Sequence, residues 1–161
     1  MTPKTSLANS ILDLNQITQP IIGETCHQIA FSYGDELLLD FGEMTAYNHP
    51  RLAHLRKGSW QLSTRATNFD LRKFSSYFKN YMCLTKRQLR RLENKKLTNF
   101  VIDSNNFKLT LSFECGYELI LEPDLEDDSG LAYWELMMPN VQILTVGPGM
   151  FWECKSIHEP Y

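Results

Sequence analysis

Residues 25–41 (TCHQIAFSYGDELLLDF) decide the fold, because their apolar pattern recurs in residues 97–113 (LTNFVIDSNNFKLTLSF). A shift of 72 positions, which places Ile29 on Val101, also aligns Leu37 with Leu109, Leu39 with Leu111, Phe41 with Phe113 and Ser32 with Ser104. Most of these positions are an even number of residues apart, which is the period of a strand and not of a helix. Each segment therefore predicts a hairpin with one buried face.

A tryptophan follows each segment at nearly the same distance. With two extra residues in the second copy, Trp60 aligns with Trp134, and the leucine two residues after each tryptophan aligns as well. The ordered set of matches favours an internal duplication. We therefore expect an α+β, mainly β protein in which two pseudo-repeated antiparallel β-units pack together, with the units at about 14–74 and 99–154.

A short basic helix is expected to connect the two units. Thr85 and Gln88 have the spacing of a capping box, so the sequence predicts a helix near 86–95 within a connecting segment at about 85–96. The sequence also predicts a helical turn at 13–17 and a short helix or helical loop at 48–58, and most of the remaining chain predicts strands. We expect the whole of 1–161 to form one domain. The strands expected in the first unit are 25–33, 36–41, 60–64 and 68–74, the last pairing with 60–64. Those expected in the second unit are 99–105, 107–114, 117–122, 131–137, 141–146 and 150–154.

Composition is that of a folded domain, with 43% hydrophobic and 22% charged residues in a chain of 161. The net charge of −3 argues against a strong overall attraction to nucleic acid. The first nineteen residues lack the apolar core of a signal peptide, and no run has the length of a membrane span. We expect a cytoplasmic protein that does not bind membranes and whose four cysteines are reduced, buried and inert.

Motifs of catalysis and cofactor binding are missing from the sequence. It contains no GxxxxGK[ST], GxGxxG or GxSxG pattern and no CxxC pair. His49 and His54 are five residues apart, which does not suit a shared metal on one helix face. We therefore assign no catalytic residue, no metal ligand and no cofactor, and we expect the protein not to be an enzyme.

Two charged segments remain as candidate binding sites. The first is the acidic loop after residue 123, whose carboxylates could dock a basic protein partner; its residues are Asp124, Glu126, Asp127 and Asp128. A solvated loop without function explains the same residues, and the pattern of a calcium-binding EF-hand is missing.

The second candidate is the basic segment 72–96, which has one acid, Glu93, and the aromatic residues Tyr77, Phe78 and Tyr81. Basic and aromatic side chains together are what phosphate neutralisation and base stacking require. The alternative is a surface helix with its charges in water and its aromatics in the core. The candidate nucleic-acid contacts are Arg72, Lys73, Lys86, Arg87, Arg90 and Arg91.

The pattern of residues 32–42 (SYGDELLLDFG), followed by residues 58–62 (GSWQL), resembles small bacterial proteins without an established function. That group is common in cyanobacteria and is sometimes similar to immunity proteins of polymorphic toxin systems. Residues 106–123 and 134–149 continue the resemblance, which covers about 14–154. It implies a duplicated β-architecture and carries over no catalytic residue.

Three functions follow as expectations. The first is a non-catalytic binding protein, for instance an immunity protein that blocks a toxin through the acidic loop and aromatic edges. The second is a nucleic-acid-binding protein that uses segment 72–96. The third is a small-molecule sensor or enzyme whose site lies between the two β-units.

Overall fold

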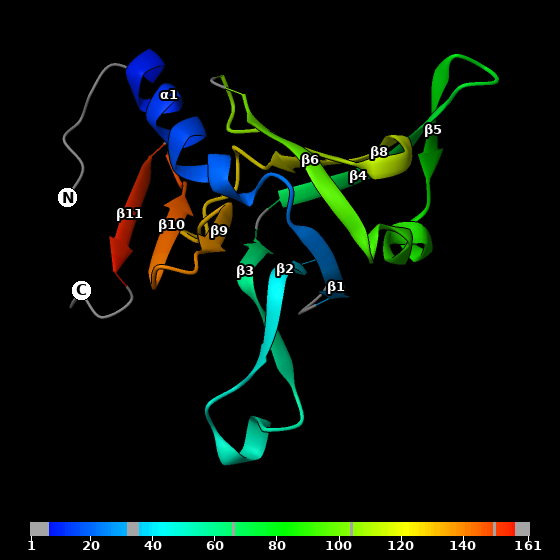
Figure 1. Cartoon of the computed structure of the whole chain (residues 1–161). Helices are drawn as coiled ribbons and strands as arrows, with labels where there is room; N and C mark the ends of the chain where they lie inside the picture. Colours follow the sequence, from blue (N-terminus) through cyan, green and yellow to red (C-terminus); the bar gives the residue numbers. More distant parts are fainter. Residues whose placement is uncertain (1–6, 32–35, 66, 104, 150, 157–161) are drawn as a thin grey trace.

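The computed structural model describes residues 7–31, 36–65, 67–103, 105–149 and 151–156. Over these residues the protein is mainly β, and its eleven strands form one antiparallel sheet in the order β11-β10-β9-β3-β2-β1-β6-β7-β8-β4-β5 (Figure 1). The strands are β1 (Thr25–Phe31), β2 (Leu37–Ala46), β3 (Arg56–Thr64), β4 (Thr67–Ser75), β5 (Asn80–Leu84), β6 (Lys95–Ile102), β7 (Leu109–Phe113), β8 (Tyr117–Pro123), β9 (Trp134–Met137), β10 (Gln142–Val146) and β11 (Trp152–Ser156).

The helical elements are short. They are the α-helix α1 (Leu7–Thr18) and the 3₁₀ helices η1 (Gln19–Ile21), η2 (Pro50–Leu52), η3 (Lys86–Leu92) and η4 (Glu114–Gly116). Leu14 of α1 is buried in the core, and the Gly23 N–H donates to the Leu97 carbonyl oxygen at 2.8 Å. These contacts fix α1 and η1 beside β6. No helix in the described ranges has the length and apolar character needed to cross a membrane.

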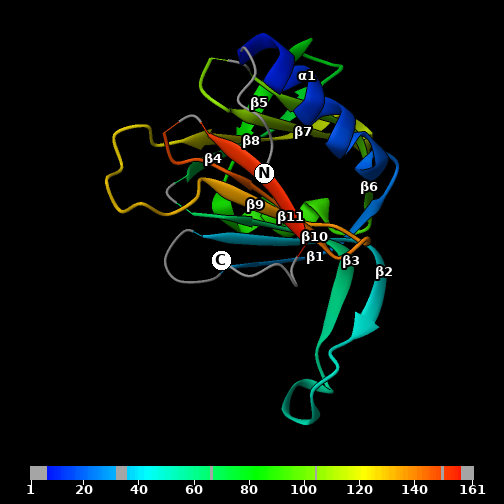
Figure 2. The same ribbon diagram turned by 90° about the vertical axis from the view of Figure 1, so that its left-hand side faces the viewer.

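The sheet curls so that its two halves face each other, with β4 to β8 in one layer and the other strands in the second (Figure 2). Rings from strands that are not neighbours in the sheet meet across the interior, with centroid distances of 6.3 Å for Phe41 and Phe113 and 6.0 Å for Phe100 and Trp134. Phe31 and Phe69 also lie 6.1 Å apart, but Phe31 is exposed. The two layers join where β1 pairs with β6, at Thr25–Lys96 and Cys26–Lys95.

The core residues follow the alternation read from the sequence in β7 and β8, but not at Val101, which is 45% exposed whereas the aligned Ile29 is buried. Every second residue of β7 is buried, and the same holds at the start of β8, because successive side chains of a strand point to opposite faces. Burying Leu109, Leu111 and Phe113 in this way contributes about 1.5–3 kcal/mol per side chain.

A β-bulge in β2 brings a buried carboxylate between β2 and β3. The register of β2 and β3 shifts between the Phe41–Trp60 and Met44–Gly58 pairs. Beside the shift, Asp40 Oδ1 accepts from the Gly58 N–H at 2.9 Å and from Gln61 Nε2 at 2.7 Å. A Cβ at Gly58 would lie 2.5 Å from the Phe41 carbonyl oxygen, so the strands approach closely only because residue 58 is a glycine.

The expected fold class, mainly β, is confirmed. The hairpin predicted at 25–41 forms as β1 and β2, although its turn at 32–35 lies outside the described residues. The six strands predicted from 99 to 154 form as β6 to β11. The pairing predicted between 60–64 and 68–74 is wrong, because β3 pairs with β2 and β9 whereas β4 pairs with β5 and β8.

The connecting helix is shorter than predicted and of a different type. It is the 3₁₀ helix η3, which ends at Leu92, and β6 already begins at Lys95. The Thr85 N–H donates to Gln88 Oε1 at 2.7 Å, as a capping box requires. Trp60 and Trp134 are both buried, but they lie on β3 and β9, which pair directly with one another. The strands thus form one continuous sheet.

Candidate binding surface

Large apolar side chains are exposed at the hairpin of β4 and β5. We call this set the hairpin surface; it consists of Phe74, Tyr77, Phe78, Tyr81 and Met82. Tyr77 and Phe78, in the turn between the strands, are 87% and 69% exposed. Their rings pack edge to face at 4.9 Å, as do those of Phe74 and Tyr81 at 5.4 Å. Contiguous exposed apolar patches mark interaction sites in folded proteins.

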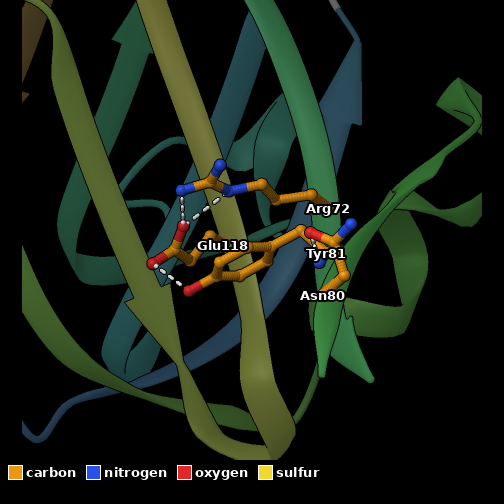
Figure 3. Close-up of polar contacts among 4 residues, drawn as sticks. All are labelled: Arg72, Asn80, Tyr81 and Glu118. Atoms are coloured by element: carbon orange, nitrogen blue, oxygen red, sulfur yellow. Dashed lines mark hydrogen bonds and ion pairs between the residues drawn. The ribbon is translucent and has the colours of Figure 1, made fainter. Parts of the chain in front are cut away.

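An ion pair supports the hairpin surface from the neighbouring strand (Figure 3). Arg72 of β4 donates through Nε to Glu118 Oε2 of β8 at 2.7 Å, and its Nη2 lies 2.5 Å from the same oxygen. Tyr81 donates its hydroxyl to Glu118 Oε1 at 3.2 Å, and the guanidinium of Arg72 lies 3.9 Å from the centre of the Tyr81 ring. These three side chains connect β5 to β4 and β8.

In the outer strand β5, one backbone N–H donates to the side chain of a neighbouring residue in the same strand. The Tyr81 N–H donates to Asn80 Oδ1 at 2.8 Å, and both residues are labelled in Figure 3. We infer from this bond that the Tyr81 N–H faces the outer side of β5 and not β4. Backbone groups of successive residues in an antiparallel strand point alternately to the two sides. The N–H of Cys83, two residues later, therefore points to the same open edge.

A basic hollow of about 350 Å³ lies on the inner side of the same hairpin. Met82 and Leu84 of β5 line it, together with Lys73 of β4 and Arg91 of η3. Lys73 Nζ also lies 5.0 Å from the centre of the buried Tyr117 ring. The hollow thus places two positive charges beside the apolar side chains of an outer strand.

A larger hollow of about 560 Å³ separates η3 from β1. Residues 28–31 form one wall, and Lys86, Arg87 and Arg90 contribute to the other. Lys86 Nζ lies 4.5 Å from the centre of the Phe31 ring. The same lysine lines a third hollow with Leu84, and Leu84 also lines the hollow at Met82. The third hollow therefore shares one lining residue with each of the other two.

The structure divides the six predicted basic contacts into three groups. Lys73 and Arg91 share the hollow at Met82, and Lys86, Arg87 and Arg90 share the hollow at β1. Arg72 instead forms the ion pair with Glu118, so its charge is partly neutralised. Sequence reasoning missed β5 as a strand and its position at the end of the sheet. The adjacent aromatics Tyr77-Phe78 in a turn were a signal that could have indicated an exposed apolar site.

The four predicted acidic residues lie together on the loop between β8 and β9, which projects from the body of the protein (gold in Figure 2). Two of the carboxylates stabilise turns within this loop. Asp124 Oδ1 accepts from the Glu126 N–H at 3.1 Å, and Asp127 Oδ2 accepts from both the N–H and the hydroxyl of Ser129. Glu126 and Asp128 are exposed. The carboxylates of Asp124 and Asp127 thus have a structural role within the loop.

Two features bear on the expected lack of chemistry. Within the described part of the chain, no group of three or more His, Cys, Asp or Glu residues could hold a metal ion. The His49 imidazole accepts from the Arg51 N–H at 3.1 Å and thereby begins η2.

No protein-family model, no curated protein and no solved structure matches this chain.

The cysteines differ in exposure, which gives a first prediction. Cys26 is buried, and desolvation raises the pKa of its thiol to about 12, whereas Cys83 and Cys115 are exposed. Burial was thus predicted wrongly for the last two. At about pH 8 we expect an aromatic disulfide reagent to label Cys83 and Cys115 quickly and Cys26 only on unfolding, because the thiolate is the reactive form. Mass spectrometry of a Cys83→Ser/Cys115→Ser variant checks this; fast labelling of Cys26 in the folded protein would contradict it.

Proposed function

We propose that this protein is a non-catalytic binding protein that contacts a partner protein through the hairpin surface. The observation that carries the proposal is the exposure of Tyr77 and Phe78, two adjacent aromatic side chains in one turn. Aromatic residues on a rigid support are the usual anchors of protein interfaces, since they bury a large area with few rotatable bonds. The ion pair of Arg72 and Glu118 provides that support.

The hairpin surface supports this function better than the acidic loop does. The carboxylates of Asp124 and Asp127 are already used in turns of their own loop. The aromatic rings of the hairpin surface, by contrast, remain in contact with water, and covering them would be favourable by the hydrophobic effect. An immunity-type role, in which the partner is a toxin, is one form of this proposal.

A lysate of the source organism provides the test. We expect crosslinking in the lysate to join the wild-type protein to a partner protein. The variant Tyr77→Ser/Phe78→Ser should recover at least about tenfold less of this partner, since interface aromatics carry much of the binding free energy. The control variant Asp124→Asn/Asp128→Asn should retain the partner like the wild type. Equal capture by the aromatic variant would sink the proposal, and loss of the partner after nuclease treatment would replace it with nucleic-acid binding.

The nucleic-acid alternative is favoured by one observation, the row of Lys86, Arg87 and Arg90 along the hollow at β1. Phosphate contacts would need these charges, and Phe31 would offer a ring for stacking. The small-molecule alternative remains a prediction as well. The interior between the layers is occupied by the ring pairs Phe41–Phe113 and Phe100–Trp134, so a ligand would have to use the surface hollows.

We also propose that the two halves of the chain arose by duplication, and the strand order supports this. Suppose that β1 to β5 are the counterparts of β6 to β10. Replacing every strand from β10 to β5 by its counterpart then gives the same order read from the opposite end of the sheet. The pairing of Leu62 with Leu136 then corresponds to that of Leu119 with Leu71. In this alignment Trp134 corresponds to Phe69, not to Trp60. Each half would exchange its last two strands with the other half.

A further inference from the structure

The two ends of the sheet differ in the number of strands beyond the paired hairpins β9–β10 and β4–β5. In the order of the sheet, β10 corresponds to β5, and β10 carries one more strand, β11, on its outer side. Along the described chain, β5 is the last strand of the sheet at its own end. We infer that the N–H of Cys83 points toward that open edge, because backbone groups alternate along a strand and the Tyr81 N–H bonds to Asn80. The edge thus offers backbone donors and acceptors where the other hairpin has a strand.

We propose that β5 binds an extended acidic segment of a partner protein, which adds to the sheet as a further strand. This inference rests on the proposed function and names the chemistry of its partner. Strand addition uses backbone hydrogen bonds for affinity and side-chain pockets for specificity. Under the proposed duplication, the position on β10 that corresponds to this edge is filled by a strand, β11.

The charges around β5 select an acidic occupant. Residues 67–92 contain seven basic residues and a single acid, Asp70, in a chain whose net charge is −3. Of the seven, Arg72 is paired with Glu118, whereas Lys73 and Arg91 line the hollow beside Met82. Two copies of the chain joined edge to edge through β5 would bring these positive charges together, which disfavours a second copy as the occupant.

The two faces of β5 would treat an added strand differently. Side chains of that strand alternate between the faces. Those on the Met82 side would meet Lys73 and Arg91, which suits Glu or Asp. Those on the other side would lie beside Tyr81, which suits apolar residues. Alternating acidic and apolar residues are therefore the expected pattern.

The experiment uses the full-length protein and a fluorescein-labelled peptide, Glu-Val-Glu-Tyr-Glu-Val-Glu. Fluorescence anisotropy should show saturable binding of this peptide and no saturable binding of the matched peptide with Lys for Glu. The acidic peptide should also slow amide exchange at Cys83, a readout specific to backbone pairing that needs no variant. Saturable binding together with slower exchange at Cys83 would support the proposal.

Two variants separate the backbone and charge contributions. Cys83→Pro removes the outward N–H without touching the bonds to β4, since proline is tolerated on edge strands at such positions. We expect it to weaken binding about tenfold, and Cys83→Ala to stay within about twofold of the wild type. Lys73→Glu/Arg91→Glu should abolish binding of the acidic peptide. Circular dichroism confirms that each variant is folded.

Several outcomes would overturn the proposal. One is an unchanged rate of amide exchange at Cys83 in the presence of saturating acidic peptide, and another is wild-type affinity for this peptide in a folded Cys83→Pro variant. The others are competition by single-stranded oligouridine that binds more tightly than the peptide, and dimerisation through β5 in analytical sedimentation. The proposed function fails separately, when a lysate partner is retained without Tyr77 and Phe78. A partner that depends on these rings while the peptide does not bind would leave the function standing and remove only strand addition.

Discussion

Trp134→Ala is expected to lower the free energy of unfolding by about 3–5 kcal/mol. The Trp134 side chain is 0% exposed and packs edge to face on Phe100 of the opposite layer. Its Nε1–H points to the Phe107 carbonyl oxygen at 3.5 Å. Alanine would leave a cavity between the two layers and remove this donor. Since a domain of this size has a stability of about 5–15 kcal/mol, chemical denaturation followed by far-ultraviolet circular dichroism should show a clear shift of the midpoint.

A matched control is an aromatic residue that makes little contact with the core. Phe78→Ala should change the free energy of unfolding by no more than about 0.5 kcal/mol, because Phe78 is largely exposed. A loss at Trp134 of less than about 1 kcal/mol would mean that the layers do not close over this ring. The same pair of variants separates residues that hold the fold from those proposed to bind a partner.

Strand positions could be predicted because alternation is a local property of the sequence. The leucines and phenylalanine of β7 show the period of two directly. Cys115-Gly116 marks the turn between β7 and β8, and Pro139-Asn140 marks the turn between β9 and β10. The partner of β4 could not be found in this way. It pairs with β8, whose residues are about fifty positions away, and local pattern carries no information on such pairings.

The candidate surface was predictable only in part. The basic residues of segment 72–96 and its aromatics were visible in the sequence, but their arrangement depends on β5. Residues 80–84 (NYMCL) show no alternation, because an outer strand with two exposed faces needs none. The ion pair of Arg72 with Glu118 joins residues 46 positions apart, so the neutralisation of this arginine appears only in the folded chain.

The hairpin of β2 and β3 depends on a buried polar contact between its two strands. Asp40 is 1% exposed, and its Oδ1 accepts two hydrogen bonds at the bulge of β2. The Gly58 N–H would otherwise be a buried donor without a partner, since the register shift moves it out of the regular ladder. Leaving such a donor unsatisfied costs more than the bond itself contributes. The carboxylate therefore fixes the bulge, and with it the register of β2 and β3.

Asp40→Ala is accordingly expected to lower the free energy of unfolding by about 2–4 kcal/mol, because both Gly58 and Gln61 would lose an acceptor. Asp40→Asn keeps the oxygen and removes a buried charge, so it should cost about 1 kcal/mol or less. Urea denaturation of both variants, with amide exchange at Gly58, makes the measurement. Exchange at Gly58 should become faster in the alanine variant and stay slow in the asparagine variant. If the asparagine variant is the less stable of the two, the charge and not the acceptor geometry holds this bulge.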